Sequence, residues 1–219
     1  DPDTGVLIPN PRNDSIGKSG VINYINKFGE ISNQHKSNDP VSELYYAAIR
    51  YLRGKGNYNV YTKPANSNLK KDHFPVITRW TDPIQYSCQR NAILGIGDVN
   101  THEDRDLLPS DDNTFMSPYG LDGYTKKVFD FENINKSASG EFTGRGNSAY
   151  IAGLAYYANT QDMRPDLAGK QTVSTYWLDV RENQTLEGRQ RNQYWLAAKY
   201  GGFNVPNNYQ PGQPLEDAW

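Results

Sequence analysis

The chain has 219 residues, with 23 Lys and Arg against 25 Asp and Glu, which gives a formal net charge of −2. This balance, without a basic run that could follow a phosphate backbone, argues against nucleic acid as a partner. No apolar run approaches the ~18 residues that a membrane-crossing helix needs, so membrane insertion is not expected. The 16 Tyr and 4 Trp favour a folded domain, and the 13 Pro and 19 Gly favour long ordered loops.

The first elements expected along the chain are two helices. Residues 1–18 show no apolar period and are expected to be irregular, and a short helix is predicted over 20–28. The stronger signal is DPVSELYYAAIRYLRG, in which Asp39 can accept hydrogen bonds from the first free N–H groups and Pro40 fits the first helical position. The apolar face of this helix is predicted to comprise Val41, Leu44, Tyr45, Ala48, Tyr51 and Leu52.

Two strands are expected next. The sequence FPVITRW is consistent with a short strand at 74–80. The unbroken apolar run from Ala92 to Ile96 is typical of a strand covered on both faces, and it ends at Asp98. Residues 99–147 are acidic, then rich in Gly and Asn, and are expected to form a long loop insertion.

The C-terminal part of the chain predicts a helix, a strand and a last helix. SAYIAGLAYYANT has a helical stripe, and its small residues Ala152 and Gly153 allow close packing on a neighbour. QTVSTYWLDV is rich in β-branched and aromatic residues and predicts a strand. RNQYWLAAKYGG predicts a helix that ends at its glycines, followed by an irregular segment over 205–219. This alternation predicts an α/β fold, a parallel sheet with helices on both faces.

Oxygen-bearing side chains crowd the segment after the first buried strand. Ligands of parallel α/β folds sit beyond the carboxyl ends of the strands, which points to this segment and to Asp179 with Glu182 after the later strand. Carboxylate, amide and hydroxyl oxygens suit Ca²⁺ or Mg²⁺. The candidate metal ligands are therefore Asp98, with Asn100, Thr101 and Asp104 as its neighbours. A solvated acidic loop is the alternative interpretation.

Motifs for catalysis are missing from the sequence. Gly95-Ile96-Gly97 lacks the third glycine of a dinucleotide site, the three histidines share no spacing, and no serine stands in a G-x-S-x-G turn. We therefore expect no enzyme, and an enzyme acting on surface glycans is a weaker alternative. The lone Cys88 has two interpretations, a buried inert thiol or a disulfide partner in another segment or chain.

Several long segments together resemble the PilC/PilY-type family of type IV pilus tip-associated adhesin and biogenesis proteins. The similarity spans most of residues 18–204 and rests on GVINYINKFG, DPVSELYYAAIRYLRG, FPVITRWTDPIQYSCQRNAILGIGDVNTHED, YIAGLAYYANTQDMRPDL and NQYWLAAKYGGF. The resemblance implies a von Willebrand factor A-like domain whose adhesion site binds a metal ion. Asp98 is similar to the acidic ligand after the fourth strand of such domains. Asp39-Pro40 stands where a Thr ligand is expected, and no D-x-S-x-S occurs. The chain would therefore be either a fragment that lacks the first strand or a domain whose adhesion site is degenerate.

The resemblance also implies where and how the protein works. Residues 1–219 would be a single von Willebrand factor A-like domain, or a fragment of one, from a longer secreted chain at the pilus tip or bacterial outer surface. Its expected function is pilus biogenesis and binding to a surface or partner, assisted by Ca or Mg if a cation binds. The expected partners are minor pilins, the pilus-tip complex, or a host or abiotic surface. The alternative is a force-bearing connector in the pilus-tip complex with no ligand of its own.

Overall fold

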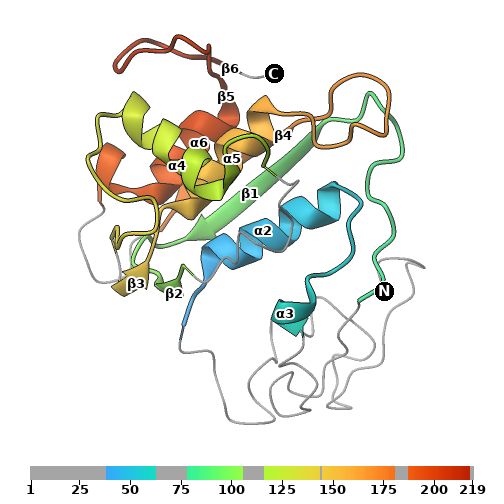
Figure 1. The fold of residues 1–219 in the computed structure, drawn as a ribbon, viewed down its shortest axis with the longest axis horizontal. Coiled ribbons are helices and arrows are strands. Elements are labelled where there is room, and N and C mark those ends of the chain that lie inside the picture. Colours follow the sequence, from blue (N-terminus) through green and yellow to red (C-terminus); the bar gives the residue numbers. More distant parts are fainter. Residues whose placement is uncertain (1–37, 63–77, 106–115, 144, 181–186, 218–219) are drawn as a thin grey trace.

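The computed structural model describes residues 38–62, 78–105, 116–143, 145–180 and 187–217 (Figure 1). Its helices are α2 (Val41–Leu52), α3 (Asn59–Thr62), α4 (Gly120–Phe131), α5 (Tyr150–Thr160), α6 (Gln193–Gly202) and the 3-10 helix η3 (Arg189–Arg191). Its strands are β1 (Asn91–Gly97), β2 (His102–Asp104), β3 (Arg145–Asn147), β4 (Val173–Asp179), β5 (Phe203–Asn204) and β6 (Glu216–Asp217).

The predicted parallel sheet is present as a pair of seven-residue strands. β1 and β4 pair in parallel, from Asn91 opposite Val173 to Gly97 opposite Asp179. β2 pairs in parallel with β3, and β5 pairs antiparallel with β6. Figure 1 shows β2 and β3 beside the arrowhead of β1, so the second pair lies at the carboxyl end of the first. The α/β class and parallel pairing are therefore confirmed.

Helix α5 forms the centre of the core. Nine of its residues are buried, from Tyr150 to Ala158, because α4, α6 and α2 pack around it. The sequence predicted an apolar stripe; the structure buries almost the whole circumference. Gly153 makes the predicted close packing possible, since a Cβ there would lie 2.2 Å from the Thr125 hydroxyl oxygen on α4.

Three helices cover one face of the β1–β4 sheet and meet at Thr175. The Tyr45 hydroxyl of α2 lies 2.6 Å from the Thr175 hydroxyl, and a Cβ on Gly201 of α6 would lie 2.8 Å from both Thr175 and Ala155 of α5. On the same face the Trp177 ring covers Gly95, where a Cβ would lie 1.9 Å from a ring carbon. The glycine therefore leaves room for the indole, which stacks on Tyr194 with 3.9 Å between ring centroids.

The opposite face of this sheet is not covered by any described element. Leu94, Ile96 and Leu178 are 67%, 64% and 56% exposed, and we call these three side chains the open face. The expectation of a strand covered on both faces, with helices on both sides, is therefore not met in the described residues. An unbroken apolar run indicates that both faces are apolar, but it does not say what packs on them.

Helix α2 occupies the predicted residues but begins and packs differently. Its N-cap is Pro40, and no side chain of that residue caps it, so the predicted cap by Asp39 is wrong. Leu44, expected in the core, is 70% exposed, and the buried positions instead include Ser42, Glu43 and Ile49. The apolar period is shifted because this helix contacts polar groups of β2 near its start as well as the core.

The segment 99–147, expected to be one long loop insertion, contains β2, α4 and β3. Helix α4 buries Leu121, Tyr124, Val128 and Phe129 against α5, a helical pattern that two glycines and the polar flanks conceal. Residues 205–219, expected to be irregular, include β6. The helix predicted over 20–28 lies outside the described residues, as do residues 74–77 of the predicted strand; residues 78–80 are not in a strand.

Candidate functional site

The carboxyl ends of β1 and β4 bring two aspartates together. Gly97 pairs with Asp179, the Val180 N–H donates to the Gly97 carbonyl at 3.1 Å, and Asp98 follows directly. Burial, and then the negative charge of Asp98, raise the pKa of Asp179. The expectation that site residues follow the carboxyl ends of the strands therefore located two carboxylates close enough for the charge of one to raise the pKa of the other. Glu182, the third predicted residue, lies outside the described residues.

Asp179 is held by one oxygen and has the other available. Its Oδ2 accepts from Asn192 Nδ2 at 2.5 Å, while its buried Oδ1 has no partner in the described part of the chain. Asn192 is itself fixed, because its Oδ1 caps α6 by accepting from the N–H groups of Tyr194 and Trp195 at 2.9 Å. On the β1 side, Asp98 Oδ1 accepts from the Asn100 N–H at 2.9 Å.

Thr101 and Asp104 belong to a different, fully buried network. The Thr101 hydroxyl donates to Asp104 Oδ2 at 3.1 Å, the Ser42 N–H donates to Asp104 Oδ1 at 2.6 Å, and Asn147 Nδ2 donates to the Thr101 hydroxyl at 3.2 Å. Burial raises the pKa of Asp104. Hydrogen bonds with the Glu43 carboxyl and the Ser42 N–H act in the opposite direction and lower it, but burial is the larger effect. These bonds fasten the start of α2 to the β2–β3 pair.

Asp39 joins the same region from the segment before α2. Its Oδ1 accepts from the His102 N–H at 2.7 Å and lies 3.2 Å from His102 Nδ1. The carboxylate that the sequence assigned to capping α2 therefore binds β2 instead. Asp104 of β2 therefore takes the capping role predicted for Asp39, and Asp39 instead holds β2.

A buried phenol lies among these carboxylates. Burial first, and then the charges of four carboxylates, raise the pKa of Tyr194 above its ordinary value; these are Asp104, Asp39, Asp98 and Asp179. The Tyr194 hydroxyl is buried and forms no hydrogen bond within the described residues. The carboxyl end of the sheet is thus an electronegative region in which buried oxygen atoms of Tyr194 and Asp179 form no hydrogen bond with the described residues.

The four predicted ligands are therefore divided between two places. Asp98 and Asn100 lie at the strand end, whereas the side chains of Thr101 and Asp104 form hydrogen bonds within the buried network. Within the described residues, no group of three or more His, Cys, Asp or Glu side chains is arranged to hold a metal ion. The pair that could share a cation is Asp98 with Asp179, and the Tyr194 hydroxyl is a neutral oxygen nearby.

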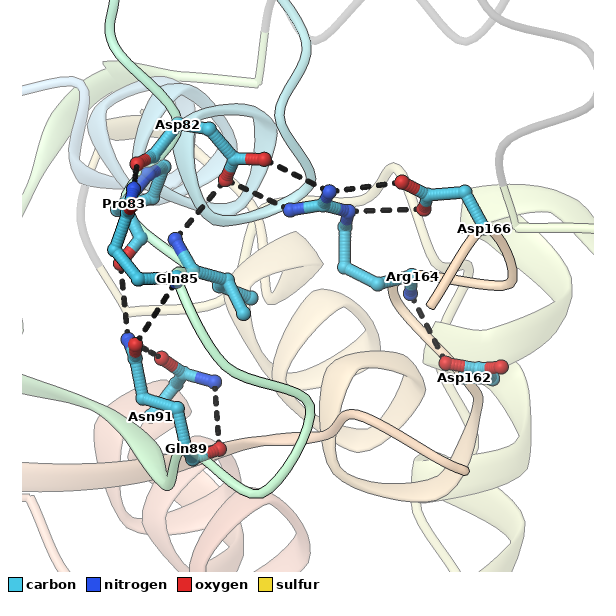
Figure 2. Close-up of polar contacts among 9 residues, drawn as sticks. Asp82, Pro83, Gln85, Gln89, Asn91, Asp162, Arg164 and Asp166 are labelled. Atoms are coloured by element: carbon cyan, nitrogen blue, oxygen red, sulfur yellow. Dashed lines mark hydrogen bonds and ion pairs between the residues drawn. The ribbon is translucent and has the colours of Figure 1, made fainter. Parts of the chain in front are cut away.

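A second polar centre, absent from the sequence analysis, lies at the opposite end of the strands. Figure 2 shows the Arg164 guanidinium between two carboxylates: it donates to both oxygens of Asp82 at 2.8 Å and to both oxygens of Asp166 at 2.9 and 2.8 Å. The Arg164 side chain is 6% exposed. We call these three residues the Arg164 clamp. They tie the segment before β1 to the segment before β4.

Neighbouring amides extend the clamp toward β1. Gln89 Nε2 donates to Asn91 Oδ1 at 2.9 Å and to the Pro83 carbonyl at 3.0 Å (Figure 2). The partners Asp82 and Arg164 are 82 positions apart, so no local spacing could reveal them. Cys88, in the same segment, is exposed, so the interpretation as a buried inert thiol is wrong.

Comparison with known proteins places these features in a family. A family model described as "PilY1 homolog, second domain" matches residues 13–175. The chain belongs to the PilY1 homolog family. It is 43% identical, over an alignment 260 positions long, to the type IV pilus biogenesis factor PilY1 homolog of Xylella fastidiosa (strain Temecula1 / ATCC 700964). That alignment covers 99% of this chain and 21% of the relative.

Membership of this family confirms the PilC/PilY resemblance. The chain spans about a fifth of the length of the curated relative that it matches. No solved structure matches the chain. Among the described residues, no helix has both the length and the apolar character that crossing a bilayer would require.

Proposed function

We propose that this chain is a binding region of a type IV pilus-tip protein, engaged in attachment and assembly and not in catalysis. Membership of a pilus biogenesis family supports the setting. The observation that carries the binding role is the open face of the β1–β4 sheet. The partner it fits is a protein component of the pilus-tip complex, such as a minor pilin, with an apolar helix or strand face of its own.

The open face has the character of an interface. On this side of the sheet, Leu94 lies opposite Tyr176 and Ile96 lies opposite Leu178, so apolar side chains pair across two strands. Parallel sheets are normally covered on both faces. Contiguous exposed apolar side chains in a protein are a common mark of a docking surface. A partner covering them gains hydrophobic free energy without rearranging the strands.

A von Willebrand factor A-like arrangement with a cation at the strand ends is the finer form of this proposal. Asp98 and Asp179 would hold Ca²⁺ or Mg²⁺, and the unsatisfied Asp179 Oδ1 and Tyr194 hydroxyl support such a site. Both are oxygen groups, which these hard cations prefer. A bound cation would neutralise the carboxylate repulsion and offer a positive charge to an acidic group of a partner or surface.

The docking role is tested by reversing the chemistry of the open face. The double variant Ile96→Lys, Leu178→Lys places two charges on exposed positions and should leave the fold intact. We expect it to lose binding to purified minor pilins, measured by biolayer interferometry. The matched control is Leu44→Lys, an apolar residue on α2 that is at least as exposed, which should bind as the wild type does. Unchanged binding by the double variant would refute the assigned surface.

The Arg164 clamp favours a second candidate function, a force-bearing connector. It links the segment before β1 to the segment before β4 through two hydrogen bonds between Arg164 and Asp82, a geometry that resists their separation. Two further bonds, to Asp166, orient the buried guanidinium within its own segment. Single-molecule pulling of the wild type and of Arg164→Met distinguishes this role. A connector predicts a clear fall in unfolding force with pilin binding unchanged, and an equal unfolding force in both proteins argues against it.

A further inference from the structure

Two adjoining polar hollows lie at the amino-terminal end of the β1–β4 sheet, away from the carboxylates at its other end. The larger has a volume of about 630 Å³ and is lined mainly by Asn159, Gln161, Lys170, Thr172, Asn204 and Asn207. The smaller, of about 260 Å³, is lined by Gln89, Arg90, Asn91 and neighbouring residues. Lys170 and Thr172 line both, so the two form one continuous surface, which we call the amide groove.

The chemistry of the amide groove differs from that of the rest of the molecule. The chain has a net negative charge, yet no acidic side chain among the described residues lines either hollow. Its polar groups are neutral amides and hydroxyls, which both donate and accept hydrogen bonds, together with the cations Lys170 and Arg90. Lys170 forms no ion pair with the described residues. Its ammonium is therefore available to an anionic ligand.

The walls of the amide groove are held in place from behind. Asn159 Nδ2 donates to the carbonyls of Tyr200 and Phe203, at 3.2 and 2.6 Å, which fixes the side chain and leaves its Oδ1 as an acceptor. Gln171, next to Lys170, is 2% exposed, and its Nε2 donates to the carbonyl of Ser87, which lines the smaller hollow, at 2.9 Å and to that of Ala168 at 2.8 Å. A preformed site binds without the cost of ordering its own side chains.

We infer that the amide groove binds an oligosaccharide that carries a carboxylate. Sugar hydroxyls are paired donors and acceptors and match the amides and Thr172, while Lys170 matches the acidic group. The volume of the larger hollow, about 630 Å³, lies in the range typical of small-ligand sites, about 300–1,000 Å³. This inference rests on the proposed binding role and adds the ligand class that attachment to a surface would use. It involves residues separate from the open face.

Matched pairs of sugars test the inference by isothermal titration calorimetry. Sialyllactose is compared with lactose, and tetragalacturonate with its methyl ester, so that each pair differs in the carboxylate. We expect at least one acidic sugar to bind at least tenfold more tightly than its neutral partner.

Lys170→Gln should remove most of that preference, because a charge-assisted hydrogen bond is lost. Asn207→Asp should weaken the binding of acidic sugars, because it places a carboxylate in the groove. Lys126→Gln, on α4 and paired with Asp130, is the control and should change nothing.

Several outcomes would overturn the inference. Binding of no sugar by the folded wild type, equal binding of the acidic and neutral members, or a Lys170→Gln variant indistinguishable from wild type would each do so. Binding of an extended acidic peptide in place of every sugar would assign the groove to proteins. The open-face variant Ile96→Lys, Leu178→Lys should keep sugar binding and Lys170→Gln should keep pilin binding, so failure of one proposal is distinguishable from failure of the other.

Discussion

Asp104 caps helix α2 from 62 residues away. Its Oδ1 accepts the Ser42 N–H at 2.6 Å, which satisfies one of the free donors of the first helical turn. Asp39, which precedes the helix and was predicted to cap it, instead accepts a hydrogen bond from the His102 N–H. The start of α2 is thus stabilised only once β2 has docked on it, so a local element depends on a distant one.

Replacing Asp104 by Ala should lower the free energy of unfolding by about 1–3 kcal/mol, because the Ser42 N–H and the Thr101 hydroxyl lose their buried acceptor. Asp104→Asn keeps an acceptor oxygen of the same shape and should recover most of the loss. Urea denaturation followed by circular dichroism measures both. The control Asp130→Ala removes an exposed carboxylate paired with Lys126 and should cost less than about 0.5 kcal/mol. Equal losses for the Ala and Asn variants would contradict the capping role.

Gly153→Ala should destabilise the protein by about 1–3 kcal/mol or more, because the new Cβ would overlap Thr125, with its hydroxyl oxygen at 2.2 Å and its backbone nitrogen at 2.6 Å. The contact between α4 and α5 must then open. Thermal unfolding provides the measurement. Gly56→Ala is the control, since a Cβ at Gly56 meets nothing within 4 Å. A Gly153 variant as stable as the control would show that the two helices are not so close.

The Arg164 clamp should respond asymmetrically to mutation. Arg164→Met leaves Asp82 and Asp166 free to be hydrated, since their side chains are 41% and 62% exposed. The double variant Asp82→Asn, Asp166→Asn instead leaves a guanidinium buried without a counter-charge, which costs more than losing the pair. We therefore expect the double variant to be the less stable of the two in urea denaturation. The reverse order would mean that the guanidinium is hydrated in the folded protein.

Acid should remove the contribution of the clamp. Hydrogen bonds from Arg164 lower the pKa of Asp82, and they lower that of Asp166 to about 2, below the ordinary value of 3.8. A carboxyl whose folded pKa is lowered adds stability above its unfolded pKa and loses it as the pH falls through the folded value. The stability difference between wild type and Arg164→Met should therefore be constant above about pH 5 and shrink toward pH 2. A difference that does not change over this range would exclude ionised partners.

Asp179→Asn should raise stability slightly at neutral pH, by about 1 kcal/mol or less, because burial and Asp98 oppose ionisation of this carboxyl. The amide oxygen remains able to accept from Asn192. Adding millimolar Ca²⁺ or Mg²⁺ should raise the melting temperature of the wild type, by mass action, and not that of the variant. Chelator should reverse the wild-type shift. A cation effect that is the same in both proteins would place the ion elsewhere.

The sequence by itself determined the elements whose signal is local. The β-branched residues of β4, the apolar run of β1 and the helical spacing of α5 and α6 each predicted their element, and the alternation of these elements implied parallel pairing. The order of strands also placed Asp98 and Asp179 at one edge, because the carboxyl ends of parallel strands meet. Gly153 signalled close helix packing because only small side chains permit it.

Tertiary structure alone decided which distant group serves each polar residue. The sequence predicted Asp39 as the local cap of α2 and Asp104 as a metal ligand, yet the docking of β2 pairs Asp39 with His102 and Asp104 with Ser42. No local pattern pairs Arg164 with Asp82. The apolar run of β1 likewise does not reveal that no described element covers its second face. Periodicity reports which side chains avoid water, whereas a hydrogen-bond partner or a covering element is chosen by how the chain folds back on itself.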